Sequence, residues 1–102
     1  MSDIQQARTA LTTRILEGDG QLPSSGRQAA FHNRGVRGPA GALVDKVARQ
    51  AWRVRDEDFA AAQATGLNED QVFEMVVCAA IGQATRQYEA ALAALEAATG
   101  TE

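Results

Sequence analysis

The sequence predicts an all-α protein, a small helical bundle with a long C-terminal helix. Apolar residues recur at intervals of three and four along most of the chain, and no segment alternates apolar and polar residues as a strand does. Two helix-start signals, Ser2 with Gln5 and Asn68 with Gln71, fit the capping-box pattern. With 102 residues and 45% hydrophobic content, residues 1–102 are expected to form a single domain.

The N-terminal part, residues 1–38, is expected to hold two helices and a basic loop. A helix over about residues 3–17 is indicated by one apolar stripe and by Gly18, which provides a stop. After a turn-rich segment, Ser25 and Gln28 are predicted to cap a short helix that runs through Phe31. The loop over residues 32–38 then carries two glycines, two arginines and no acid.

The remaining residues, 39–98, are expected to form the helical core. Pro39 suits a first helical position, and the following apolar spacing predicts an amphipathic helix that ends near Arg53. On this helix Trp52 is predicted to be a core anchor. Acidic residues 56–58 favour the start of a short alanine-rich helix, which Gly66 closes.

The last helix is predicted to run from Glu69 to Ala98, on the order of 45 Å at 1.5 Å per residue. Its first half, Val72–Ile81, offers apolar side chains on every face, which is typical of a helix surrounded by other helices. Because one small subunit supplies too few neighbours, we expect this segment to be hidden by further copies of the chain. The sequence therefore predicts a homo-oligomer.

Charge is divided unevenly along the chain, although the net charge is only −3. Residues 1–55 carry nine Arg and Lys against four acids, whereas residues 56–102 carry one Arg against nine acids. This favours pairing between helices or copies, or docking of an acidic protein partner, over nucleic-acid binding. The longest apolar run is too short to span a bilayer, so a cytoplasmic protein without membrane contact is expected.

A family pattern is visible in residues 54–74, which read VRDEDFAAAQATGLNEDQVFE. An acidic helix start, an alanine-rich turn ending in Ala-x-Gly-Leu and a new helix with a polar cap and two acids follow in this order. Over residues 43–98 the chain resembles the alkylhydroperoxidase D-like, or carboxymuconolactone decarboxylase-like, family. The resemblance implies an all-α, oligomeric fold and, for peroxide-reducing members, an antioxidant activity.

The resemblance does not extend to the redox centre. Peroxidase-related members use a Cys-x-x-Cys pair followed by a histidine, and a glutamate that assists proton movement. Aligned on Cys78, this chain has Ile81 in place of the second thiol and Thr85 in place of the histidine. The expected function is therefore an altered small-molecule activity, on peroxides or in lactone or decarboxylase chemistry, or a non-enzymatic interaction or accessory role.

Candidate catalytic residues are Glu74, Cys78 and His32. Glu74 and Cys78 are four residues apart and share one helix face, where an apolar setting raises a carboxyl pKa and permits proton exchange with a thiol. His32 completes a proton relay if its loop folds over the long helix. The favoured alternative is structural. In it Cys78 is a small buried side chain, Glu74 pairs with an arginine of the basic half, and His32 forms hydrogen bonds within its loop.

Arg34 and Arg37 are candidate anion-binding residues, because they flank the free N–H groups of the helix that begins at Pro39. The loop is otherwise expected to be solvated or to face another subunit. Its glycine spacing matches neither the P-loop nor the dinucleotide fingerprint. Cys78 is the only cysteine and His32 the only histidine, so neither a paired-thiol redox centre nor a cysteine-rich zinc site is expected within one chain. No metal or cofactor is predicted.

Overall fold

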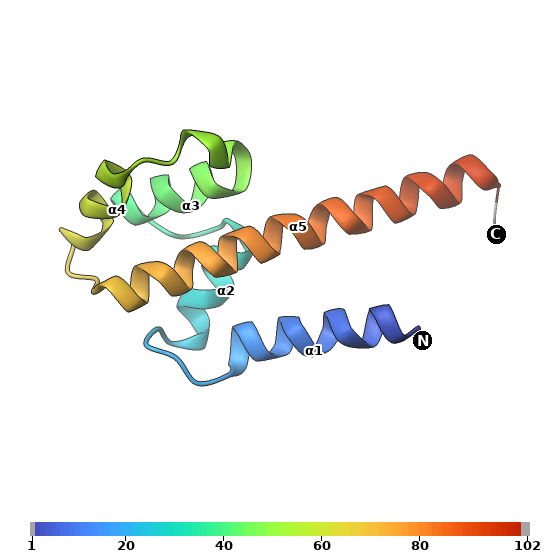
Figure 1. The fold of residues 1–102 in the computed structure, drawn as a ribbon, viewed down its shortest axis with the longest axis horizontal. Helices are drawn as coiled ribbons and strands as arrows, with labels where there is room; N and C mark the ends of the chain where they lie inside the picture. The colour runs from blue at the N-terminus through green and yellow to red at the C-terminus, as the bar shows by residue number, and fades with distance from the viewer. Residues whose placement is uncertain (1, 101–102) are drawn as a thin grey trace.

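A computed structural model describes residues 2–100, which form five α-helices and a short 3-10 helix with no strand among them (Figure 1). This confirms the predicted all-α class and the long C-terminal helix. In chain order the elements are α1 (Asp3–Glu17), α2 (Ser24–His32), α3 (Gly38–Gln50), η1 (Ala51–Arg53), α4 (Asp56–Gln63) and α5 (Glu69–Thr99).

Both predicted capping boxes are present. The Ser2 hydroxyl accepts a hydrogen bond from the Gln5 main-chain N–H, and the Gln5 side chain accepts one from the Ser2 N–H. Asn68 and Gln71 exchange the same two bonds at the start of α5, at 2.8 and 2.9 Å. Each box satisfies main-chain donors that have no partner within the helix, which explains why α1 and α5 begin where the sequence indicates.

The predicted cap of α2 is wrong. The helix begins at Ser24 after Pro23, and no side chain caps it. The Ser24 hydroxyl instead donates a 2.8 Å hydrogen bond to the main-chain carbonyl of Leu16 at the end of α1. This serine therefore ties two successive helices together.

The hydrophobic core lies around the first half of α5, where α2, α3 and α4 pack on it (Figure 1). From α3, Leu43 and Val44 are almost fully buried. The end of α2 approaches α5 most closely at Gly82, where a Cβ atom would lie 1.8 Å from the carbonyl oxygen of Phe31. The buried residues of α5 are Val72, Met75, Cys78, Ala79 and Gly82.

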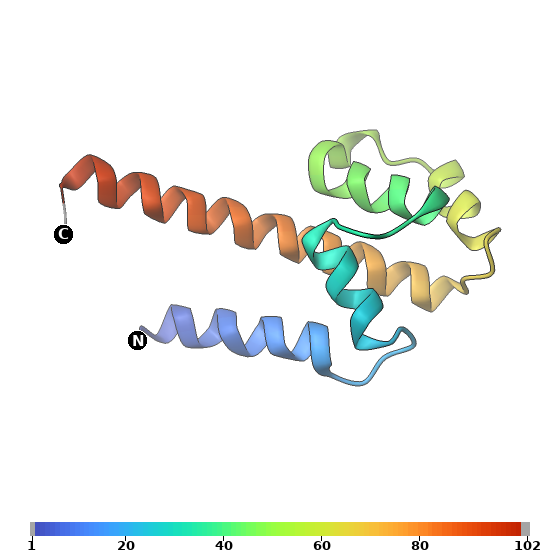
Figure 2. The same cartoon turned by 180° about the vertical axis from the view of Figure 1, so that it is seen from behind.

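The second half of α5 extends away from this core, and α1 runs antiparallel beside it (Figures 1 and 2). Arg8 joins the two helices, since its guanidinium lies 4.3 Å from the centre of the Tyr88 ring and its Nη2 lies 3.5 Å from Glu89 Oε2. No residue of α1 is buried. The molecule is elongated, with extents of 50 × 29 × 20 Å.

The predicted burial of Trp52 is wrong. Trp52 is 79% exposed, because the α-helix ends at Gln50 and the tighter η1 turn removes position 52 from the inner face of α3. Within Val72–Ile81, Phe73 is 65% exposed and Ala80 is also exposed, since the helices of one protomer cover only part of α5. Cover of this segment by further copies of the chain stays a prediction. No helix in residues 2–100 combines the length and hydropathy needed to cross a membrane.

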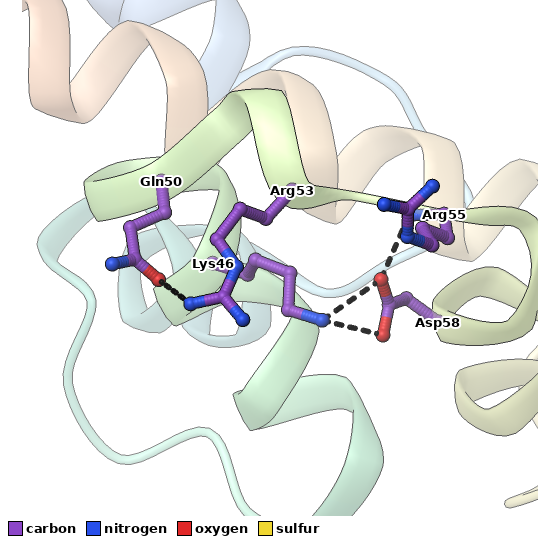
Figure 3. A network of polar contacts seen from close by, with 5 residues as sticks. All are labelled: Lys46, Gln50, Arg53, Arg55 and Asp58. Carbon is purple, nitrogen blue, oxygen red and sulfur yellow. Dashed lines mark hydrogen bonds and ion pairs between the residues drawn. The ribbon is translucent and has the colours of Figure 1, made fainter.

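The oppositely charged halves of the chain meet within the protomer. Lys46 on α3 donates to both carboxylate oxygens of Asp58 on α4, at 2.9 and 3.1 Å (Figure 3). Asp58 also accepts a 2.8 Å hydrogen bond from the main-chain N–H of Arg55. The pair Arg8–Glu89 joins the same two halves at the other end of the molecule.

Candidate functional site

A groove lies where the end of α1, the start of α2 and the first half of α5 meet. Its volume is about 460 Å³, within the usual range of small-molecule sites. It contains two of the predicted catalytic residues, Glu74 and Cys78, on successive turns of α5. The lining residues are Leu11, Arg14, Ile15, Gly18, Asp19, Arg27, Phe73, Glu74, Val77 and Cys78.

Glu74 holds the connection between α1 and α2. Its two carboxylate oxygens accept hydrogen bonds from the main-chain N–H groups of Gln21 and Leu22, at 2.7 and 2.9 Å. Gly20 permits this approach, because a Cβ atom there would lie 2.7 Å from Glu74 Oε1. Both oxygens are therefore engaged by the backbone, and no arginine forms an ion pair with Glu74 in the described part of the chain.

Cys78 is a buried thiol, with 1% of its surface exposed. Burial raises the pKa of Cys78 above its ordinary value of 9.0, and the Glu74 charge raises it further, while the Arg27 charge opposes both. The thiol is thus protonated at neutral pH. A nucleophilic or redox-active cysteine requires the opposite, a lowered pKa and access to solvent.

Arg27 is the least expected residue of the groove, because its side chain is charged and only 7% exposed. Its Nη1 donates a 3.1 Å hydrogen bond to the carbonyl oxygen of Ile15, near the partially negative end of α1. Its Nε is buried and has no hydrogen-bond partner among residues 2–100. No carboxylate of these residues forms an ion pair with it.

His32 does not line this groove. The side chain is exposed at the end of α2 and lies edge-on to the Phe31 ring, with 5.0 Å between ring centres. It lines two other hollows together with Arg86, and in one of them Arg34 is also present. The described structure therefore does not assemble the proton relay of Glu74, Cys78 and His32.

The predicted anion-binding arginines are both exposed on the loop before α3. Gly35 and Gly38 take left-handed backbone conformations, with φ of 84° and 66°, which turn the chain into the helix. Arg34 lines a hollow with His32 and Arg86, whereas Arg37 is the N-cap residue of α3 and makes no side-chain cap. The two guanidinium groups do not line one hollow.

Sequence reasoning missed Arg27 and Arg14 as groove residues. Both are single basic residues within predicted helices, and only tertiary packing distinguishes them from solvated ones. The nearest local signal is that Arg27 stands in the first turn of α2, where a cation is unfavourable beside the positive helix end. In residues 2–100 no cluster of His, Cys, Asp and Glu side chains could hold a metal ion.

Comparison of the chain with protein families, with curated proteins and with solved structures finds no match in any of the three.

Proposed function

We propose that this chain is a non-enzymatic association protein that works as a homodimer, in which two copies pair through α1 and an apolar stripe along α5. The observation that carries the proposal is an apolar stripe along one side of α5, most of it exposed, with Arg8 of α1 lying over its Tyr88 ring. It recurs at intervals of three and four residues and contains no charged side chain. The stripe consists of Phe73, Val77, Ala80, Ala84, Tyr88, Ala91 and Leu95.

The neighbouring helix extends this apolar surface. On α1, Ile4 and Leu11 are exposed and seven residues apart, the same interval that separates Tyr88 from Leu95. Leu11 lines one hollow with Phe73 and Val77, so the apolar surfaces of α1 and α5 adjoin. Exposed apolar surface that is contiguous over two helices is typical of a binding face.

The solvent-accessible surface of the single chain is large enough to include an interface with one partner. A compact monomer of 10.8 kDa exposes about 5,500 Å². This chain exposes 6878 Å², about 1,400 Å² more, which is enough to supply the roughly 800 Å² per partner of a stable interface. Its radius of gyration of 15.3 Å likewise exceeds the roughly 13 Å of a compact domain of this length.

A second copy is the partner that this geometry favours. Two antiparallel helices form one layer, and two such layers related by a two-fold axis complete a four-helix bundle. The small side chains of Ala84 and Ala91 allow the backbones to approach closely. The resemblance to the alkylhydroperoxidase D-like family, which implies an oligomeric helical protein, is in keeping with this proposal.

The alternative, a peroxide- or lactone-processing enzyme, has less support. It requires Glu74 to move protons and Cys78 to react, but both Glu74 oxygens accept main-chain hydrogen bonds and the Cys78 thiol is buried and protonated. His32, the third candidate, lies outside their groove.

The test is sedimentation equilibrium of variants with charge placed on the stripe. Ala84→Arg and Ala91→Arg each put a guanidinium at an exposed helical position, so we expect the protomer fold to remain intact. We expect the dimer dissociation constant to rise about tenfold or more for each variant. Ala90→Arg, an exposed position of the same helix outside the stripe, is the matched control. Equal dissociation constants for Ala90→Arg and Ala91→Arg would contradict the proposed face.

A further inference from the structure

We propose that the groove between α1, α2 and α5 binds a small monocarboxylate with an apolar tail, whose carboxylate is held by Arg27. The residues at its centre come from three helices and are far apart in the sequence. Arg27 and the apolar wall belong to one protomer, but Leu11, Phe73 and Val77 of this wall are also part of the surface proposed for the dimer. Ligand binding is therefore compared between the unmodified chain and the Ala91→Arg variant.

The first argument is the free edge of the Arg27 guanidinium. Nη1 donates to the carbonyl oxygen of Ile15, and no hydrogen bond in the described structure uses Nε or Nη2. Nε and Nη2 form the opposite edge of the planar group, with two parallel N–H bonds. This edge matches the two oxygens of a carboxylate, the pairing that arginine makes most strongly.

The second argument is the environment of this charge. A buried charged residue costs free energy unless an anion compensates it, and Arg27, which is 7% exposed, has no carboxylate of residues 2–100 in ion-pair contact. The carbonyl of Ile15 compensates only part of the charge. An anionic ligand that enters the groove would complete the compensation.

The third argument restricts the ligand to a single negative charge. Arg14 and Arg27 face the groove together with two acids, Asp19 and Glu74. Among residues 2–100 no carboxylate forms an ion pair with Arg27, so a ligand with one carboxylate suits it, whereas further negative charges on the ligand would meet Asp19 and Glu74. Because the Glu74 oxygens already accept the N–H groups of Gln21 and Leu22, Glu74 does not compete for Arg27.

The apolar wall defines the rest of the ligand. Leu11 and Ile15 of α1 line the groove together with Phe73 and Val77 of α5. The volume of about 460 Å³ admits a chain or ring of moderate size beyond the carboxylate. A straight-chain fatty acid such as octanoate is the probe that fits both parts of the site.

The test is isothermal titration calorimetry of the full chain with straight-chain acids from acetate to decanoate, each compared with its neutral amide. We expect octanoate to bind at least tenfold more tightly than octanamide, and Arg27→Lys to remove most of this preference. Phe73→Ala, at an exposed position, is expected to weaken octanoate binding several-fold and to leave acetate binding unchanged.

Matched controls outside the groove are Arg53→Gln and Trp52→Ala, an exposed arginine and an exposed aromatic residue, and neither is expected to change octanoate affinity. Should Arg27→Lys fail to fold, the comparison of acid with amide and the Phe73→Ala variant still decide the question. The proposal is overturned if no acid in the series binds more tightly than its amide, or if Phe73→Ala and Trp52→Ala affect octanoate binding equally.

Discussion

The main-chain carbonyl oxygen of Phe31 accepts a 2.7 Å hydrogen bond from Nη1 of Arg86. Phe31 is in the last turn of α2, and Arg86 lies on α5 just beyond Gly82, where the two helices approach most closely. This arginine satisfies a carbonyl that has no partner within α2, so the only base in the acidic half anchors the crossing of the two helices.

Gly82→Ala tests this crossing. The added Cβ atom would lie 1.8 Å from the carbonyl oxygen of Phe31, so α2 must shift and the Arg86 hydrogen bond must lengthen. We expect the free energy of unfolding, measured by urea denaturation, to fall by about 1–3 kcal/mol. Gly26→Ala is the control, because its Cβ atom would meet only Leu22 Cδ2 at 3.9 Å. That variant is expected to gain up to ~1 kcal/mol from helix propensity.

Glu74→Gln tests whether the carboxylate of Glu74 stabilises the fold. An amide retains one acceptor oxygen and presents an N–H to the second main-chain donor of the pair Gln21 and Leu22. The expected loss in free energy of unfolding is about 1.5–3 kcal/mol. Glu96→Gln, at an exposed position of the same helix, should change stability little. An unchanged denaturation midpoint for Glu74→Gln would mean that these hydrogen bonds contribute nothing to stability.

Cys78 is predicted to resist thiol reagents. Its burial requires local opening before a reagent can reach the sulfur, and its raised pKa leaves little thiolate near neutral pH. Labelling by a chromogenic disulfide at pH 8 should be slower in the native protein than in the unfolded chain by on the order of a hundredfold or more. Similar labelling rates in the native and unfolded protein would show that the Cys78 thiol is accessible and would support the enzyme hypothesis.

The ion pair between Lys46 and Asp58 predicts a pH dependence of stability (Figure 3). The hydrogen bond from Lys46 holds the pKa of Asp58 below its ordinary value of 3.8, and the Arg55 N–H adds to this effect. Because the folded pKa is lowered, its contribution to stability is present above pH 3.8 and is lost as pH falls through the lower folded pKa.

Asp58→Asn measures this contribution. The variant should be less stable than the wild type at neutral pH, and the difference should shrink as the pH is lowered below 3.8. Asp56→Asn is the control, since Asp56 is exposed in the same helix turn. A stability difference that stays constant from pH 7 to pH 3 would contradict the assignment.

The sequence predicts much of the fold because helix signals are local. The capping boxes at Ser2 and Asn68 lie within three residues of their partners, and the structure places α1 and α5 as expected. Trp52 was misplaced because the spacing that made it a core residue continues past Gln50, where the backbone leaves the α-helix. A change of helix type by a few residues has no strong sequence signal.

The candidate site was less predictable because its contacts are non-local. The partners of Glu74 are main-chain groups of Gln21 and Leu22, more than 50 residues earlier in the chain, and no side-chain pattern marks them. The burial of Arg27 depends on how three helices meet. Gly82 was a usable signal, since a glycine inside an apolar helix indicates a close approach of another backbone.

The most direct test of the proposed association is the mass of the unmodified chain by sedimentation equilibrium over a range of concentrations. If the Kd of the dimer is about 1 µM, nearly all chains are dimeric at a concentration of about 100 µM. We therefore expect a mass of twice 10.8 kDa at this concentration, and a fall towards 10.8 kDa on dilution. A constant mass of 10.8 kDa throughout the range would contradict it.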